Sequence, residues 1–185
     1  MNPSFETAVG DAAAAATVRL LVLDVDGVMT DGGIHLDDRG VETKRFHVRD
    51  GTGIKIWRTL GYETALITGR RGDVVRHRAA ELGIKHVIQG ADDKGHALRR
   101  LLSDLRLAEA DTAILADDLP DLPMARLAGY PMAVADAAPE IMGMARFVTS
   151  RPGGHGAVRE AIEHLIRARG QWGAALHLFG HEIHG

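Results

Sequence analysis

The sequence predicts a doubly wound α/β fold, in which one parallel β-sheet carries helices on both of its faces. Short apolar, β-rich runs alternate with helical patterns from Val18 to about Arg169. Several of the helical patterns place apolar residues at positions i, i+3 and i+4 and stop at glycine, as amphipathic helices do. Strands that alternate with helices in this way form a parallel sheet that is covered on both sides.

Six runs are expected to form the strands of this sheet. The first, VRLLVLD at residues 18–24, is a buried run that ends in an acidic residue. The second, YETALIT at residues 62–68, is followed by Gly69, and the others span residues 84–89, 111–117, 130–135 and 145–150. Helices are expected between them at residues 51–61, 71–83, 93–107, 119–129 and 136–145, with a longer helix after residue 156.

One segment breaks the alternation of strands and helices. Residues 31–48 contain two short β-like arms around the turn DDRG, which favours a hairpin. Because it follows the first strand directly, this hairpin could form a flap over the carboxyl end of that strand. No insertion is long enough for a separate cap domain. The predicted organisation is a flexible leader at residues 1–17, one domain at residues 18–169 and a C-terminal tail at residues 170–185.

The composition excludes several classes of function. A formal net charge of -3 offers no broad attraction to nucleic acid or to an anionic membrane. The absence of cysteine excludes disulfides, thiolate metal sites and a cysteine nucleophile. No apolar run approaches the roughly 20 residues that span a bilayer, and the opening residues lack the basic region of a signal peptide. We therefore expect a cytoplasmic protein.

Chemically active side chains follow successive strands of the predicted sheet. Asp24 and Asp26 end the first strand, Thr68 ends the second, Lys94 opens the helix after the third, and Asp117 ends the fourth. Open α/β sheets bind ligands at the carboxyl ends of their strands, so these groups should converge. Carboxylates bind a hard cation such as Mg²⁺, while lysine and hydroxyl groups offset the charge of phosphate oxygens. This collection matches the needs of phosphoryl transfer.

The spacing of Asp24 and Asp26 suggests a division of labour. Asp24 would attack phosphorus, and Asp26 would protonate the leaving oxygen and later activate water. Taken alone, the Asp-x-Asp pattern is more often an acidic loop after a strand. The order in which Thr68, Lys94 and Asp117 follow at later strand ends favours the catalytic interpretation.

Several longer segments resemble the haloacid dehalogenase superfamily of phosphatases. The segments DVDGVMTDGG, ITGR, DDK and ADDLPD look like the four motifs of that superfamily. A closer resemblance is to the capless 3-deoxy-D-manno-octulosonate 8-phosphate phosphatases, carried by residues 46–55, 67–84, 134–141 and 153–162. The resemblance covers roughly residues 18–171, most of the chain. It implies a small tetrameric enzyme in which residues 18–169 are the phosphatase domain.

The resemblance also implies particular roles at matching positions. Asp24 would be the nucleophile and a ligand of Mg²⁺, Asp26 the acid/base and a second ligand through its backbone carbonyl, and Asp117 the third ligand. Thr68 and Lys94 would hold the transferring phosphoryl group. The implied substrate is an eight-carbon sugar-acid phosphate used in lipopolysaccharide biosynthesis. The positions that would contact it, besides Asp26 and Lys94, are His47, Val48, Arg49, Asp50, Gly51, Lys55, Arg70 and Arg78.

Two positions depart from the family pattern. Ala116 stands where the family usually has glycine, and a small residue there implies only a local adjustment. His47 replaces a commoner asparagine, which leaves the substrate contact at that position open.

Other polar groups have both a structural and a functional interpretation. Asp121, like its neighbour Asp118, could orient Lys94 or a metal-bound water, or simply cap the next helix. The arginines Arg49, Arg70, Arg71 and Arg78 could clamp a substrate carboxylate, although a single arginine is usually a solvated surface group. Residues 153–156 (GGHG) could bind an anion before a helix or form a flexible lead-in to it, and the lead-in is favoured.

Three alternative functions remain at this point. A phosphoacceptor signalling domain uses similar groups, but its acidic pair precedes the phosphorylated aspartate, whereas here the pair at residues 117–118 comes last. A nonulosonate 9-phosphate phosphatase would share the chemistry and a nearly identical sugar acid. A noncatalytic interaction module has no need for the intact set of Asp24, Asp26, Lys94 and Asp117.

Overall fold

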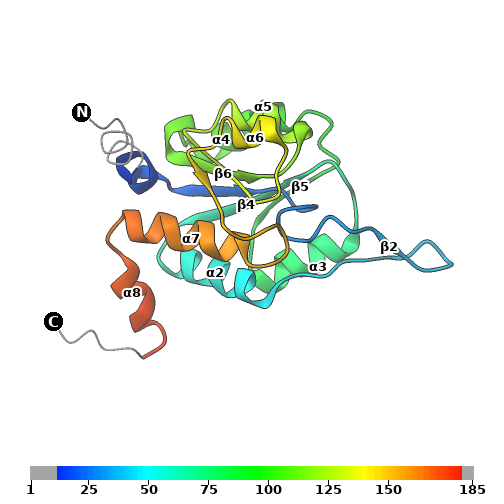
Figure 1. Ribbon diagram of the computed structural model, residues 1–185, viewed down its shortest axis with the longest axis horizontal. Helices are drawn as coiled ribbons and strands as arrows, with labels where there is room; N and C mark the ends of the chain where they lie inside the picture. The colour runs from blue at the N-terminus through cyan, green and yellow to red at the C-terminus, as the bar shows by residue number, and fades with distance from the viewer. Residues whose placement is uncertain (1–11, 181–185) are drawn as a thin grey trace.

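The structure, a computed structural model that describes residues 12–180, confirms the predicted doubly wound sheet. Six parallel strands lie in the order β5-β4-β1-β6-β7-β8 (Figure 1). Each strand falls within a run that was predicted as a strand. The strands are β1 (Leu20–Leu23), β4 (Glu63–Thr68), β5 (His86–Gln89), β6 (Thr112–Ala116), β7 (Tyr130–Ala133) and β8 (Phe147–Val148).

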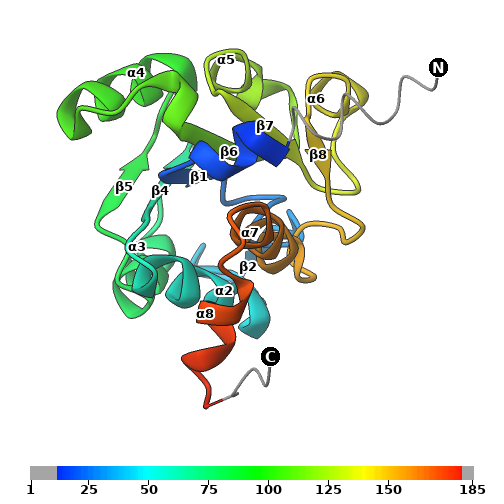
Figure 2. The ribbon, with the colours of Figure 1, turned by 90° about the vertical axis from the view of Figure 1, so that its left-hand side faces the viewer.

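Helices cover both faces of this sheet. One face carries α4 (Lys94–Leu105), α5 (Leu122–Ala125) and α6 (Pro139–Met142), and the other carries α2 (Val48–Thr59), α3 (Asp73–Leu82) and α7 (Ala157–Ala168) (Figure 2). Short 3₁₀ turns occupy residues 109–111 and 119–121. Among the described residues, none of the helices combines the length and the apolar character needed to cross a membrane.

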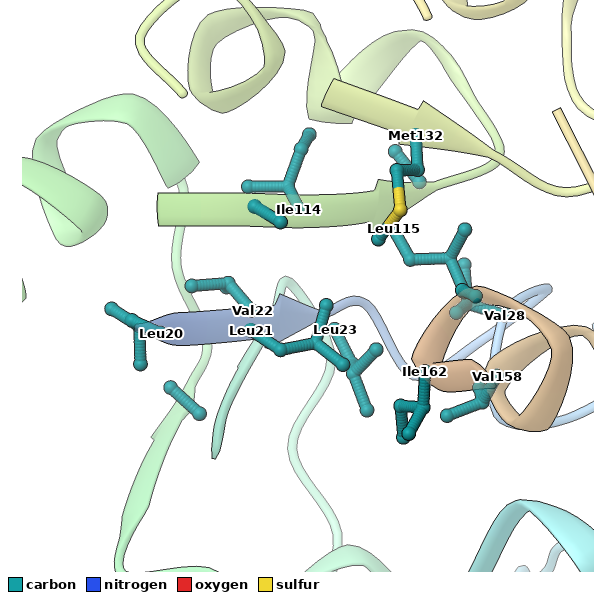
Figure 3. Close-up of a cluster of buried hydrophobic side chains, with 14 of the residues drawn as sticks. Leu20, Leu21, Val22, Leu23, Val28, Ile114, Leu115, Met132, Val158 and Ile162 are labelled. Carbon is teal, nitrogen blue, oxygen red and sulfur yellow. The ribbon is translucent and has the colours of Figure 1, made fainter. Parts of the chain in front are cut away.

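The central strand β1 is buried along its whole length. All four of its residues are fully buried, and it pairs in parallel with β4 on one side and with β6 on the other. Its side chains meet those of Ile114 and Leu115 on β6, and Val158 and Ile162 of α7 lie below its carboxyl end (Figure 3). A continuous apolar run is the pattern expected of a strand that is covered on both faces.

Strand order places a crevice at the carboxyl end of β1. The chain proceeds outward from β1 through β4 to β5, then returns to the other side of β1 and proceeds outward through β6, β7 and β8. The connections before and after this reversal leave the sheet in opposite directions, so their loops separate at the carboxyl edge. Asp24, which follows β1, therefore lies at the topological switch point.

The predicted hairpin forms, with β3 beside the site and its turn directed away from it (Figure 1). Its strands β2 (His35–Leu36) and β3 (Glu42–Thr43) pair antiparallel, and the arm projects from the body of the molecule (Figure 1). The tip is a turn at Asp37–Gly40, closed by the backbone bond from Gly40 N to Asp37 O. The returning arm comes back to the sheet after β3. Contact with the carboxyl edge begins within β3, where Glu42 Oε1 accepts a hydrogen bond from Arg70 Nη2 at 2.7 Å.

Helical segments lie near both ends of the described chain. Residues 12–17, assigned to a flexible leader from the sequence, form a helical turn in which Ala15 is fully buried. Alanine has the highest helix propensity, which explains why this alanine run orders against the domain. Residues 1–11 of the leader lie outside the described part of the chain. The C-terminal tail begins with α8 (Trp172–His177), where the Arg167 guanidinium lies 4.3 Å from the centre of the Trp172 ring.

Candidate active site

The carboxyl edge of the sheet holds a polar cavity of about 190 Å³. It contains all five residues whose convergence was expected from the sequence, because β1, β4 and β6 end side by side and α4 begins beside them. Arg70 is the one predicted substrate contact from outside that set that also lines it. The lining residues are Asp24, Asp26, Thr68, Gly69, Arg70, Lys94, Asp117, Asp118, Pro120 and Asp121.

The ammonium group of Lys94 lies between two buried carboxylates. Its Nζ atom donates to Asp24 Oδ1 at 2.6 Å and to Asp121 Oδ1 at 2.5 Å. Asp121 is 1% exposed, and its second oxygen accepts a hydrogen bond from the backbone N–H of Asp117 at 3.3 Å. Its side chain makes no helix-capping bond. Of the two interpretations of Asp121, the structure therefore supports the one in which it orients Lys94.

Asp117 lies directly against the turn that follows β1. Gly27 has φ +99°, and a Cβ atom at this position would clash with the Asp117 carboxylate. The close approach brings carboxylate oxygens of Asp24, Asp117 and Asp121 within 4.8 Å of one another. Three oxygen ligands at this spacing suit a hard divalent cation. The carboxylate of Asp26 is not in this cluster, and its predicted role as a ligand was through the backbone carbonyl.

The carboxylates of the cluster hold their protons more tightly than usual. Burial, followed by the charge of Asp121, raises the pKa of Asp24 from 3.8 to about 6. Burial, followed by the charges of Asp24 and Asp121, raises the pKa of Asp117 to about 8. Negative charge is thus concentrated beyond what the single ammonium of Lys94 balances. The donor set and its charge fit a bound divalent cation.

The returning arm of the hairpin brings two further charged residues to the edge of the cavity. Lys44, whose side chain is 2% exposed, forms ion pairs with Asp26 Oδ1 and with Glu42 Oε1, the latter at 3.1 Å. The same Glu42 oxygen accepts from Arg70 Nη2 at 2.7 Å. We did not identify Lys44 and Glu42 from the sequence. Their i, i+2 spacing on the returning arm was the available signal, because it places both side chains on one face of an extended chain.

Most of the predicted substrate contacts lie outside the catalytic cavity. Val48, Gly51, Lys55 and Arg78 line a separate cavity of about 160 Å³. Another cavity, of about 430 Å³, includes Arg49 together with Arg151 and Arg159. The cause is the first turn of α2, which places successive residues on different sides of the helix.

The other two predicted contacts from this stretch line none of these cavities. Asp50 is 2% exposed, and its Oδ1 accepts from the backbone N–H of Arg159 at 2.8 Å, while Oδ2 has no partner. His47 is half-buried, and its Nδ1 atom also has no partner. A single chain therefore does not gather residues 47–51 around Asp24.

The arginine group and the glycine-rich segment also differ from expectation. Arg71 lies beside Arg76 and β5, so Arg49, Arg70, Arg71 and Arg78 do not form one cluster. Within residues 153–156, Gly153 and Gly154 are packed against the chain, whereas Gly156 lines the cavity that contains Arg49. A Cβ atom at Gly153 would overlap the carbonyl oxygen of Gly27, and one at Gly154 would clash with Thr30. These glycines allow the segment to pack directly on the turn after β1.

Comparisons with known proteins agree with this geometry. The model of the haloacid dehalogenase-like hydrolases matches residues 84–162. The chain is 45% identical to 3-deoxy-D-manno-octulosonate 8-phosphate phosphatase KdsC of Escherichia coli strain K12 over 159 residues, which are 86% of this chain and 85% of that protein.

Solved structures extend the similarity to three dimensions. The crystal structure of 3-deoxy-D-manno-octulosonate 8-phosphate phosphatase from Yersinia pestis matches with a TM-score of 0.85 and 43% identity, covering 86% of each chain. The phosphatase from Moraxella catarrhalis, in complex with a magnesium ion, a phosphate ion and a KDO molecule, matches with a TM-score of 0.89 and 38% identity. That match covers 92% of this chain and 98% of the other.

The similarity covers most of each chain in both sequence and structure. Identity of 45% over most of both chains is far beyond a shared fold alone. The chain therefore belongs to the family of 3-deoxy-D-manno-octulosonate 8-phosphate phosphatases, within the haloacid dehalogenase-like hydrolases.

Proposed function

We propose that this chain is a Mg²⁺-dependent phosphatase that hydrolyses 3-deoxy-D-manno-octulosonate 8-phosphate to the free sugar acid and phosphate. The reaction belongs to lipopolysaccharide biosynthesis. One observation carries the proposal: Asp24, Asp26, Thr68 and Lys94 line one cavity together with the acidic cluster. The identity to phosphatases of this specificity supports the choice of substrate.

The first step is transfer of the phosphoryl group to Asp24. A carboxylate oxygen of Asp24 forms the new bond to phosphorus while the ester bond to the sugar oxygen breaks. Asp26 gives its proton to the sugar oxygen of the broken ester bond, so the sugar acid leaves as an alcohol. Lys94, held by Asp24 and Asp121, offsets negative charge on the phosphoryl oxygens, and Thr68 supplies a hydroxyl donor from the end of β4.

The second step releases phosphate and restores the enzyme. A water molecule attacks phosphorus, and the carboxylate of Asp26 takes its proton as the bond from phosphorus to Asp24 breaks. Asp26 thereby returns to its protonated state, and Asp24 returns to a carboxylate. Atoms and protons balance over the two steps, with one water consumed for each phosphate released.

The divalent cation would be held by Asp24, Asp117 and the backbone carbonyl of Asp26. When bound, it supplies a positive charge that neutralises phosphate oxygens. The carboxylate spacing and the raised pKa values of Asp24 and Asp117 support this assignment. The magnesium ion in the Moraxella catarrhalis relative supports the choice of metal.

Recognition of the sugar acid is assigned to the stretch from His47 to Gly51 with Lys55, Arg70 and Arg78. Their cationic groups suit the carboxylate that distinguishes this substrate from a neutral sugar phosphate. Since most of them lie outside the catalytic cavity of one chain, we infer that a second copy completes the site. A homotetramer is the assembly we propose, and a cytoplasmic location stays a prediction.

The proposal is tested by comparing phosphate release from three substrates, with Mg²⁺ and with chelator. We expect kcat/KM to be highest for the eight-carbon sugar-acid phosphate, lower for a nine-carbon sugar-acid 9-phosphate and far lower for a neutral hexose phosphate. A ligand without a carboxylate would bury the cationic side chains of the site without pairing them. The site therefore discriminates against a neutral hexose phosphate. Equal efficiency on the hexose phosphate would remove carboxylate recognition, and preference for the nine-carbon acid would reassign the substrate.

A further inference from the structure

The carboxylate of Asp26 is held on both oxygens by groups from different parts of the chain. Lys44, at the base of the hairpin, pairs with Oδ1. The hydroxyl of Thr68, at the end of β4, donates to Oδ2 at 3.5 Å. An aspartate side chain has two torsion angles, and ligands on both oxygens fix both of them. The orientation of the group that transfers protons is therefore set by these two contacts.

These contacts belong to a closed ring of hydrogen bonds. From Lys44 the ring continues to Glu42 Oε1 at 3.1 Å and from there to Arg70 Nη2 at 2.7 Å. The backbone N–H of Arg70 donates to Thr68 Oγ1 at 3.2 Å, which returns the ring to Asp26. The ring joins the hairpin to the end of β4 at the edge of the catalytic cavity.

Most of the charged side chains of the ring are largely buried, unlike those of an ion pair on the protein surface. The Lys44 side chain is 2% exposed, Glu42 is 14% exposed and Asp26 is 20% exposed. An ammonium group removed from water is tolerated only when it is paired. Glu42 provides a permanent partner, so Lys44 remains paired while Asp26 is in its neutral form during the reaction.

We propose that Lys44 is a positioning residue for Asp26, and that Glu42 positions Lys44. The inference rests on the proposed phosphatase function and adds a role for the hairpin base in proton transfer. Lys44 holds Oδ1, which leaves Oδ2, beside Thr68, as the oxygen that gives the proton to the leaving group. The hairpin thus contributes to catalysis through its base, although its tip projects away from the site (Figure 1).

Two aryl phosphates of similar size separate this role from a purely structural one. Phenyl phosphate has a poor leaving group that needs the proton from Asp26, whereas p-nitrophenyl phosphate has a good one that needs it far less. The variant Lys44→Met removes the charge while nearly preserving the length of the side chain. We expect kcat/KM to fall by about 10- to 100-fold on phenyl phosphate and by at most about threefold on p-nitrophenyl phosphate.

Two further variants make the test decisive. Glu42→Gln leaves Lys44 in place and should show a smaller loss with the same dependence on the leaving group. If thermal melting shows that Lys44→Met does not fold, the Glu42→Gln variant tests the inference in its place. Lys85→Met, at an exposed lysine before β5, should leave both rates unchanged.

The outcomes distinguish this inference from the proposed function. A wild-type protein that releases phosphate from neither compound, nor from the sugar-acid phosphate, would overturn the proposed function and the inference with it. If the wild type is active and the folded variants lose equal factors on both compounds, or lose nothing, the inference alone is overturned.

Discussion

A single buried ammonium group organises the acidic residues at the carboxyl edge of the sheet. The side chain of Lys94 is 8% exposed and lies between Asp24 and Asp121. Burial alone would lower the pKa of Lys94, but the charges of Asp24 and Asp121 outweigh it and raise the pKa. Lys94 is therefore cationic at neutral pH and always available to a phosphoryl group.

The nucleophile gives the first prediction at this scale. Asp24→Asn keeps the shape of the side chain and its hydrogen bond from Lys94, but an amide oxygen cannot form the phosphoenzyme. We expect turnover to fall by at least about 10³-fold, whereas Asp26→Asn should cost about 10²–10⁴-fold through lost proton transfer. Phosphate release measures both, with circular dichroism as the control for folding. Wild-type turnover by Asp24→Asn would end the covalent mechanism.

The raised pKa values predict how stability depends on pH in the metal-free protein. Asp24 and Asp117 have folded-state pKa values of about 6 and about 8, above their ordinary value of 3.8. A carboxyl group with a raised pKa contributes stability that is complete below its unfolded pKa and is lost as pH rises through its folded pKa. In EDTA, the melting temperature should therefore fall between pH 5 and pH 8.5, at constant ionic strength (about 0.15 M).

Asp117→Asn is the matched variant for this experiment. It removes the carboxylate with the higher pKa, so the decrease in melting temperature at the high-pH end of the range should become smaller. At pH 8 in EDTA, the variant should therefore melt at a higher temperature than the wild type. Added Mg²⁺ should stabilise the wild type more at pH 8 than at pH 6, and should stabilise the variant little. A wild type whose melting temperature rises with pH in EDTA would contradict the assignment.

At the scale of elements, two loops hold the catalytic edge in shape by direct backbone packing. The segment around Gly153 lies on the turn at Gly27, which in turn contacts the carboxylate of Asp117. The backbone N–H of Gly153 also donates to Asp136 Oδ1 at 3.0 Å. The position of Asp117 thus depends on a segment that precedes α7, far from it in sequence.

This packing predicts a functional cost for Gly153→Ala. Its methyl group would displace Gly27, and overpacking of this kind typically costs about 1–3 kcal/mol of stability. The concentration of Mg²⁺ needed for half-maximal activity should rise as well. Gly40→Ala is the control, since it has φ +77° and open space around it, and it should lose stability without any change in metal dependence. Unchanged metal dependence in Gly153→Ala would show that the two loops move independently.

The elements themselves were largely predictable from the sequence, and the contacts between distant loops were not. Runs such as residues 18–24 identify strands because an apolar stretch followed by acid and glycine has few other interpretations. The ion pair of Lys44 with Asp26 depends on where the returning arm of the hairpin meets the sheet, which no local pattern encodes. The close approach of Gly153 to Gly27 is hidden for the same reason.

Some residues of the candidate site were likewise predictable from local sequence, and others were not. Asp24, Thr68, Lys94 and Asp117 converge because each follows a strand or opens a helix at one edge of a parallel sheet, a rule that local sequence can express. The stretch 47–51 was assigned by resemblance alone. Its residues lie on several sides of the first turn of α2, and a single chain does not bring them together around Asp24.

At the scale of the whole molecule, exposed apolar side chains predict assembly. The hairpin exposes Ile34, Leu36 and Val41 by 55%, 62% and 52%, and the tail exposes Phe179 by 66%. A projecting arm with an apolar surface is suited to burial against other copies. We expect light scattering to give the mass of four chains.

A charged substitution on the hairpin tests the interface without disturbing the domain. Ile34→Asp should dissociate the assembly and lower kcat/KM for the sugar-acid phosphate more than for p-nitrophenyl phosphate. Val148→Asp, at the partly exposed outer strand β8, is the control and should leave the mass unchanged. A fully active monomeric wild type would contradict the proposal that a second copy completes the site.

The central place of β1 in the sheet also determines the order in which the chain can fold during synthesis. Leu20 pairs with Glu63 on one side and with Thr112 on the other, so the second partner is made about ninety residues after the first strand. At roughly 5–20 residues per second, the nascent chain waits several seconds with the backbone N–H and C=O groups along one edge of β1 unpaired. The same delay separates the synthesis of two residues of the acidic cluster, because Asp24 is made before it and Asp117 after it. A ribosome-bound chain therefore cannot acquire its metal until most of the domain has been synthesised.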